Sequence, residues 1–140
     1  MESRYGKKAA DEYAMGLRNS IMNDKPVIGI YDVNQEGSGD MYFKGVQIIH
    51  TYRQIVNDDV KFRAMLHEMN KRFGHKTTTT QEVEALMQEY TDVNLEGFFN
   101  TYLRTVQIPK LHLQVGKKEV KAWFTDVRPG FAIPVNLQIN

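Results

Sequence analysis

The hydrophobic pattern of the chain changes its period close to Pro109, and this change constrains the fold most. Before Pro109, apolar residues recur every three to four positions, which is the spacing of one helix face. After it, they alternate with polar residues, as in strands with one buried side. The sequence therefore predicts an α+β chain that is mainly α. The same change predicts a boundary between a helical unit, residues 1–109, and the start of a β domain, residues 110–140.

Local signals set the limits of about five predicted helices. Asn23-Asp24-Lys25-Pro26 ends the first, because proline disfavours the α conformation of the residue before it. Asp40 can serve the second as an N-cap or first-turn acid. Gly74 stops the third, and Thr79 with Glu82 forms a capping-box pattern for the fourth. The helices are predicted from about Tyr5 to Met22, Asp40 to Val56, Asn57-Asp58-Asp59 to Phe73, Thr79 to Tyr90, and Asn94 to Tyr102.

The second helix is predicted to bury one face, and the C-terminal residues are predicted to form about three antiparallel strands. The buried helix face comprises Tyr42, Val46, Ile49, Tyr52 and Val56, widened by Ile48 and Ile55. The inward residues of the strands are Leu111, Leu113 and Val115, then Val120, Ala122 and Phe124, and then Phe131, Ile133, Val135, Leu137 and Ile139.

Composition excludes several classes of function. Eighteen basic and 17 acidic residues give a formal charge of +1, so nothing favours binding to nucleic acid or to an anionic membrane. The chain has no cysteine, which removes thiolate metal sites and a cysteine nucleophile. No apolar run approaches the ~20 residues needed to span a bilayer, and the first residues do not resemble a secretory signal. A soluble chain is expected, and the compartment is not indicated.

The histidines do not suggest a metal site. His67-Glu68-Met69-Asn70-Lys71 resembles the opening of an H-E-x-x-H zinc helix, but Lys71 stands where the second histidine is required. His50, His75 and His112 have no companion at ligand spacing. No zinc or other cofactor is therefore predicted for this chain itself.

Short runs along the chain match, in order and spacing, segments of one peptidase family. The most specific run is Asp40-Met41-Tyr42-Phe43-Lys44-Gly45. The others are Tyr5-Gly6-Lys7, Gly16-Leu17-Arg18, Asn23-Asp24-Lys25-Pro26-Val27-Ile28-Gly29, Ile49-His50-Thr51-Tyr52-Arg53, Asp58-Asp59, Thr79 to Tyr90, and Leu95-Glu96-Gly97-Phe98-Phe99. From Tyr5 to Ile139 the chain resembles the zinc aminopeptidases of the aminopeptidase N family, which are gluzincin peptidases.

The resemblance implies a part of an enzyme with its metal ligands elsewhere. It implies the helical C-terminal half of a thermolysin-like catalytic domain, followed by the first strands of a β-sandwich domain. In that family the zinc ligands and the loop for the substrate's amino group precede the segment that matches Tyr5. The tyrosine matched by Tyr42 donates a hydrogen bond to the oxyanion formed at the scissile carbonyl. A phenol suits this role, because it stays protonated at neutral pH.

Two further site residues are expected from their position in the sequence. Tyr31 and Asn34 lie in the long connection just before Tyr42, and such connections are often functional, so both are expected to line the substrate cleft. The parent enzyme would remove N-terminal residues from peptides with zinc, whereas the isolated chain is expected to bind no zinc and to be inactive.

Two alternatives remain at this point. From composition alone, the favoured interpretation of Tyr42 is the first apolar residue of a core stripe, and it is the surrounding family pattern that favours the catalytic role. The chain as a whole can also be a non-catalytic helical interaction module that associates with itself or another chain through its C-terminal strands, whose edges invite pairing.

Overall fold

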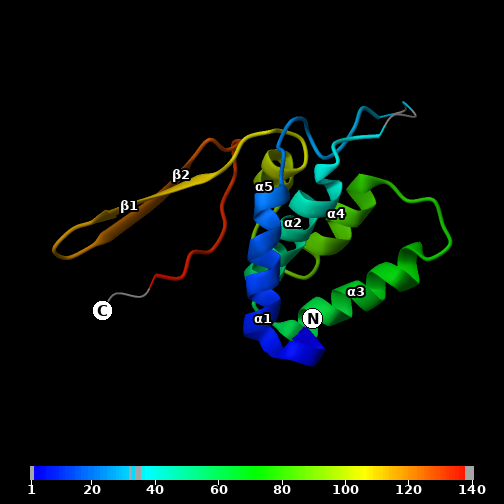
Figure 1. Cartoon of the computed structure of the whole chain (residues 1–140), viewed down its shortest axis with the longest axis horizontal. Coiled ribbons are helices and arrows are strands. Elements are labelled where there is room, and N and C mark those ends of the chain that lie inside the picture. Colours follow the sequence, from blue (N-terminus) through cyan, green and yellow to red (C-terminus); the bar gives the residue numbers. More distant parts are fainter. Residues whose placement is uncertain (1, 32, 34–35, 138–140) are drawn as a thin grey trace.

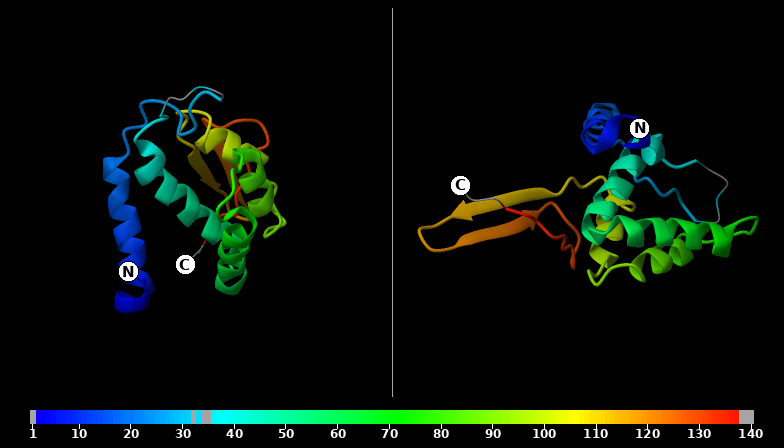
Figure 2. Two further views of the ribbon diagram at one scale, coloured as in Figure 1. Left: turned by 90° about the vertical axis from the view of Figure 1, so that its right-hand side faces the viewer. Right: turned by 90° about the horizontal axis from the view of Figure 1, so that it is seen from below.

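The fold was obtained as a computed structural model, which describes residues 2–31, 33 and 36–137 (Figure 1). A body of helices comes first, and a two-stranded antiparallel hairpin projects from it (Figures 1 and 2). The predicted α+β, mainly α fold class is confirmed. Of the helices in the described part of the chain, none combines the length and apolar character needed to cross a bilayer. The elements are α1 (Glu2–Gly16), the 3-10 turn η1 (Leu17–Ser20), α2 (Asp40–Val56), α3 (Asp59–Phe73), α4 (Thr80–Gln88), α5 (Glu96–Tyr102), β1 (Lys110–Val115) and β2 (Val120–Thr125).

The first helix is less regular than its sequence predicts. Gly6 has φ 83° and ψ 168°, so α1 is kinked there. This conformation lies in the region that glycine tolerates and other residues avoid. α1 ends at Gly16, and the predicted continuation to Met22 is replaced by the tighter turn η1.

The caps of α3 and α4 agree with the sequence. The Asp58 side chain accepts hydrogen bonds from the amides of Val60 (2.8 Å) and Lys61 (3.0 Å). At α4, Thr79 Oγ1 accepts from the Glu82 amide (3.3 Å), and Glu82 Oε2 accepts from the Thr79 amide (2.7 Å). The predicted capping box is therefore confirmed, and these bonds satisfy amides that have no partner inside the helix.

The core lies between α2, α3, α4 and α5, and Tyr52 is at its centre. Tyr52 is fully buried, and its hydroxyl donates a 2.8 Å hydrogen bond to the carbonyl of Met87. Its ring lies 6.1 Å from that of Phe62, centroid to centroid. The other buried members of this cluster are Ile48, Ile55, Met65, Met87, Leu95, Phe98 and Phe99.

The predicted inner face of α2 is partly wrong. Ile48, Tyr52 and Ile55 are buried, but they share their row with Asp40 and Lys44. The residues predicted to begin the buried face point the other way: Tyr42, Val46 and Ile49 are exposed to 68%, 41% and 40%. Apolar residues recur at helical spacing both along the row of Ile48 and Tyr52 and along the row of Tyr42, Val46 and Ile49. The buried polar contacts of Asp40 and Lys44 decide which of these two rows turns inward.

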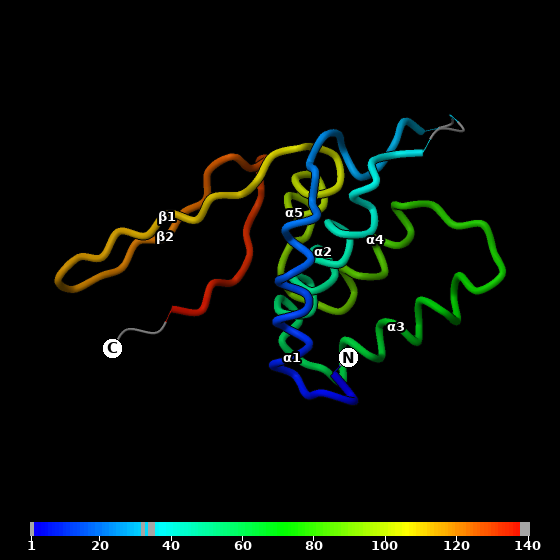
Figure 3. Tube along the Cα trace, viewed as in Figure 1, coloured from blue at the N-terminus to red at the C-terminus, as the bar shows by residue number. Residues whose placement is uncertain are grey.

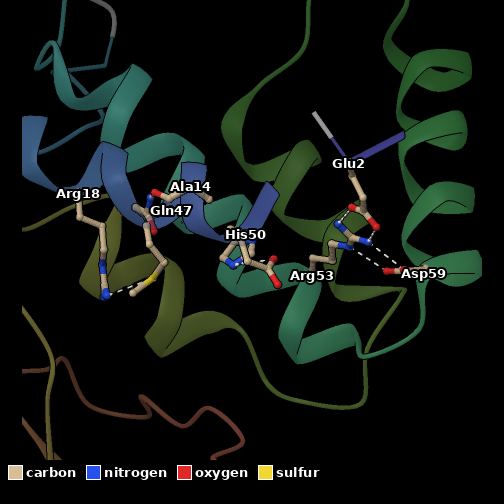
Figure 4. A network of polar contacts seen from close by, with 9 residues as sticks. Glu2, Ala14, Arg18, Gln47, His50, Arg53 and Asp59 are labelled. Atoms are coloured by element: carbon tan, nitrogen blue, oxygen red, sulfur yellow. Dashed lines mark hydrogen bonds and ion pairs between the residues drawn. The ribbon is translucent and has the colours of Figure 1, made fainter. Parts of the chain in front are cut away.

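Polar contacts join α1, α2 and α3 at one end (Figure 4). The Arg53 guanidinium donates to Glu2 Oε2 (2.6 Å) and Oε1 (3.1 Å), and to both carboxylate oxygens of Asp59 (2.8 Å each). Hydrogen bonds from Arg53 lower the pKa of both carboxyl groups. Further along α1, the Gln47 side chain donates to the carbonyl of Ala14. These contacts hold α1 against α2 (Figures 2 and 4).

The predicted third strand does not form within the described residues. After β2 the chain turns, and the Phe131 ring packs 5.1 Å from Phe124 and 5.8 Å from Tyr102. Ile133 packs on the helical core, and Pro134 has no amide proton to donate to a sheet. Residues 131–137 therefore start beside the helices and then lead away from them in an extended path, below the hairpin in Figure 3. The predicted inward residue Ile139 lies outside the described residues.

This path depends on one glycine. A Cβ atom at Gly97 in α5 would collide with the backbone of Gly130 and Phe131. The missing side chain lets the segment after the hairpin approach α5 at backbone distance. The connection between hairpin and helices is thus fixed at both Phe131 and Gly97.

The buried hydroxyl of Tyr52 makes stability depend on alkaline pH. Burial, with a smaller contribution from Tyr90, raises the pKa of Tyr52 to about 12 from an ordinary value of 10.0. The unfolded chain then releases this proton at lower pH than the folded chain. The free energy of unfolding should therefore fall between pH 10 and 12, by on the order of 2 kcal/mol from this group.

Urea denaturation of wild type and Tyr52→Phe across that range tests this dependence. The variant should lose about 1 kcal/mol at pH 7, because the Met87 carbonyl loses its donor, and should fall less steeply above pH 10. Parallel curves for the two proteins would contradict the assignment.

Candidate functional site

Asp40, at the start of α2, is the centre of a buried polar cluster. Its carboxylate oxygens accept from the backbone amides of Met22 (2.9 Å) and Asn23 (2.6 Å), and the residue is fully buried. Its own amide donates to Ser38 Oγ (3.1 Å), which in turn donates to Asp24 Oδ1 (2.6 Å). Gly39 is the N-cap residue, and Asp40 lies in the first turn of α2, so of the two roles expected for Asp40 the first-turn acid is confirmed. Asp40 also binds the preceding segment to the first turn of α2.

Lys44 extends this cluster to the segment that follows α5. Its ammonium donates to Asn23 Oδ1 (2.9 Å) and to the carbonyl of Thr105 (3.2 Å), and only 6% of the residue is exposed. Asn23 adds a 2.5 Å bond from Nδ2 to the carbonyl of Val106. Burial lowers the pKa of Lys44, and the nearby Asp40 carboxylate opposes this shift. One lysine thus joins three segments that are distant in sequence.

Tyr42 lies on the opposite side of the same two helical turns. Two residues along a helix correspond to a rotation of about 200°, so Tyr42 points away from the side that buries Asp40 and Lys44. Its side chain is 68% exposed. Tyr42 is therefore not a core residue of this chain, and that alternative is wrong.

The surface around Tyr42 is an open groove of about 520 Å³ between α1, α2 and α3. Its lining is mainly apolar, with Arg53 and His50 at the polar end. His50 Nε2 lies 3.9 Å from Asp11 Oδ1 of α1. The lining residues are Ala14, Met41, Tyr42, Gly45, Val46, Ile49, His50, Arg53 and Phe62.

Tyr31 does not share this groove. It lines a separate hollow of about 400 Å³ together with Pro26, Ile28 and Arg104. Its hydroxyl accepts a 3.4 Å bond from Gln81 Nε2 of α4. Asn34, the other expected cleft residue, lies outside the described residues. Proximity in sequence to Tyr42 therefore does not place Tyr31 beside it.

No cluster of three or more histidine, aspartate or glutamate side chains that could hold a metal ion occurs within residues 2–31, 33 and 36–137. His67 and Lys71 lie on exposed positions of α3, and the latter pairs with Glu68 at 3.8 Å. The described residues do not fit a zinc site.

Comparison with known protein-family models, curated proteins and solved structures finds no match to this chain.

The structure adds functional candidates that the sequence reasoning left unassigned. Lys44 carried no expected role, and Asn23 appeared only as part of a helix stop and of one run that matches the family. A signal was present in the spacing, because Asp40 and Lys44 fall on the same helical row as Ile48 and Tyr52. Charged residues at core positions must be paired or hydrogen-bonded, and this requirement could have indicated a buried cluster.

Replacing Asp40 tests whether this cluster holds the start of α2. In Asp40→Asn one acceptor oxygen becomes a donor, so one of the Met22 and Asn23 amides loses its partner in a buried site. The free energy of unfolding should fall by about 2 kcal/mol in urea denaturation.

Asp92→Asn provides the matched control, because Asp92 is exposed. Its effect should stay within about 0.5 kcal/mol. Equal effects of the two substitutions would show that the Asp40 contacts do not hold the fold.

Proposed function

We propose that this chain forms part of a zinc aminopeptidase, in which Tyr42 stabilises the oxyanion of the transition state. The observation that carries the proposal is the orientation of the first turns of α2 about the helix axis. In the run Asp40-Met41-Tyr42-Phe43-Lys44-Gly45, the charged residues are buried and the tyrosine is presented to solvent. Burying two charged residues costs free energy, which an ordinary amphipathic helix avoids. An arrangement that presents Tyr42 to solvent at this cost supports a functional role for Tyr42.

The chemistry requires a donor whose position is fixed before the substrate arrives. Charge appears on the carbonyl oxygen only when water attacks, and a fixed hydrogen-bond donor stabilises that charge without reorganisation. A phenol hydroxyl is such a donor at neutral pH. The proton stays on Tyr42, and the hydrogen bond strengthens as the oxyanion develops.

The buried cluster supports the positioning. Asp40 and Lys44 flank Tyr42 along α2, and each is hydrogen-bonded to a segment outside the helix. The backbone that carries Tyr42 is thus fixed at residues on both sides. Active-site groups need this kind of support to be held within fractions of an ångström.

The apolar groove supports a role as a cleft wall. Met41, Val46 and Ile49 continue the surface beside Tyr42 and are partly exposed. In the proposal they contact the substrate or the remainder of the catalytic domain. Zinc would be held by residues outside this chain, so no step that uses the metal is assigned to the residues described here.

Tyr42→Phe, in the enzyme expressed from the complete coding sequence, tests the proposal. The variant should retain its zinc content and lose about 10²–10³-fold in kcat for an aminoacyl p-nitroanilide, equivalent to about 3 kcal/mol of transition-state stabilisation. KM should change little, because the donor acts on charge that is absent from the ground state.

Tyr13→Phe is the matched control, since Tyr13 is an exposed tyrosine of α1. It should leave kcat unchanged. Full turnover in Tyr42→Phe, or the absence of an H-E-x-x-H helix from the complete protein, would refute the proposal.

A second candidate function is association through the hairpin, and one observation favours it. Leu111, Leu113 and Val115 of β1 pair with Phe124, Ala122 and Val120 of β2, so one side of the hairpin is apolar throughout. Val115 is 74% exposed and Leu113 48%. The other side carries polar pairs, with His112 stacked on Trp123 at 5.4 Å. An isolated two-stranded hairpin gains stability when such a face is covered.

Light scattering after size-exclusion chromatography tests the second candidate. The wild-type chain should show a mass that rises with concentration, and Leu113→Lys should remain monomeric. Gln114→Lys, on the polar side of the same strand, should behave as wild type. A wild-type chain that is monomeric at all concentrations would exclude self-association through this face.

A further inference from the structure

A third cavity, of about 410 Å³, lies on the Lys44 side of α2. It is bounded by η1 and the residues after it, by α2, and by the segment that follows α5. Its volume is within the range of small-molecule sites in proteins. Tyr42 does not line it, so binding in this cavity is independent of the role proposed for Tyr42.

Lys44 lines the cavity, and its buried ammonium group has one hydrogen-bond donor that the described residues do not use. An ammonium has three donors, and Lys44 uses two of them, on Asn23 Oδ1 (2.9 Å) and the Thr105 carbonyl (3.2 Å). In the part of the chain that the structure describes, none of the ion pairs involves Lys44. Asp40 attracts Lys44 from the adjacent turn, but it does not line the cavity, and both its oxygens accept backbone amides. A buried cation with a free donor favours an anion as its third partner.

Arg18 supplies a second positive charge to the same cavity. Its guanidinium makes one weak contact among the described residues, from Nη1 to the thioether sulfur of Met15 at 3.5 Å (Figure 4). No aspartate or glutamate is among the described residues that line the cavity. Two cations without a facing carboxylate make its electrostatic potential positive.

The other residues that line the cavity determine what else a bound anion should carry. Ile21, Ile48 and Ile108 contribute aliphatic surface, and Pro109 closes one side. Gln107 Oε1 is buried and has no partner within the described part of the chain. The wall therefore combines an aliphatic surface with the two cations and with polar side chains such as Gln47, Thr51 and Tyr102.

We propose that this cavity binds a small carboxylate that carries an aliphatic group. The carboxylate accepts from the free donor of Lys44 and from the Arg18 guanidinium, and the aliphatic group lies on the isoleucines. A neutral aliphatic molecule leaves both cations without a partner, and an inorganic phosphate leaves the aliphatic surface of the three isoleucines uncovered.

Titration of the chain with 4-methylpentanoate, followed by ¹H–¹⁵N NMR, tests this proposal. The matched control is 4-methylpentanamide, which has the same shape without the charge. The acid should bind at least about tenfold more tightly than the amide, because charge-assisted hydrogen bonds are roughly twice as strong as neutral ones. The shifted amides should belong to residues around the cavity, such as Met22, Gln47 and Gln107. Equal dissociation constants for acid and amide would overturn the proposal.

Substitutions assign the binding to its residues. Arg18→Gln should raise the dissociation constant of the acid about fivefold or more, whereas Arg63→Gln, at an exposed arginine of α3, should leave it unchanged. Lys44→Met should abolish the preference for the acid; if it unfolds the chain, Arg18→Gln keeps the test decisive. An equal effect of the two arginine substitutions would overturn the proposal.

N-acetyl-leucine distinguishes the source of the carboxylate. It carries an aliphatic side chain and a carboxylate, together with the amide group that a peptide has at its C-terminal residue. Binding tighter than that of 4-methylpentanoate would identify the C-terminal residue of a peptide as the ligand. Binding of 4-methylpentanoate alone would identify a free aliphatic acid.

Discussion

The buried carboxylate of Asp40 is the interaction on which the arrangement of the chain depends. It accepts two backbone amides from the segment after η1, and through Asn23 and Lys44 the same cluster reaches the residues after α5. No apolar contact could do this as specifically, because hydrogen bonds to a charged, buried group are both directional and costly to leave unmade. The rotation of α2 about its axis follows from this cluster. That rotation in turn decides which side chains enter the core and which face solvent.

Much of the helical part can be predicted from sequence, since its signals are local. The capping box at Thr79 and Glu82 depends on residues within one turn and forms as predicted. α3 also begins within the predicted run Asn57-Asp58-Asp59, with Asp58 as its cap. The α2 limits are also as predicted, from Asp40 to Val56. The face of α2 could not be predicted in the same way, because apolar residues occur on two rows of that helix. Long-range contacts at Asp40 and Lys44 choose between the rows, and periodicity alone carries no information about them.

The predicted third strand, which does not form, shows a different limit of prediction from sequence. Alternation from Phe131 onward is correct as a pattern, but a strand also needs an edge to pair with and amides to donate. Pro134 removes one donor, and Gly97 offers the backbone a close approach to α5 instead. The same limit applies to the candidate site. Tyr42 could be singled out from its neighbours in sequence, whereas the separation of Tyr31 from it depends on where the intervening loop turns, which no local pattern specifies.

The two sides of α2 therefore have different physical requirements. The inner side is polar at its beginning and is satisfied by hydrogen bonds within the chain. The outer side is apolar at its beginning, and Met41, Tyr42, Val46 and Ile49 remain partly exposed next to one another. Single exposed apolar residues are ordinary, but a contiguous group of them along one groove marks a surface that meets something else. A helix that turns charged residues inward and apolar residues outward is stable only if the inward charges are well bonded, which Asp40 and Lys44 are. The outward surface then remains available for the role proposed for Tyr42, and this difference between the two sides connects the fold of α2 to that proposal.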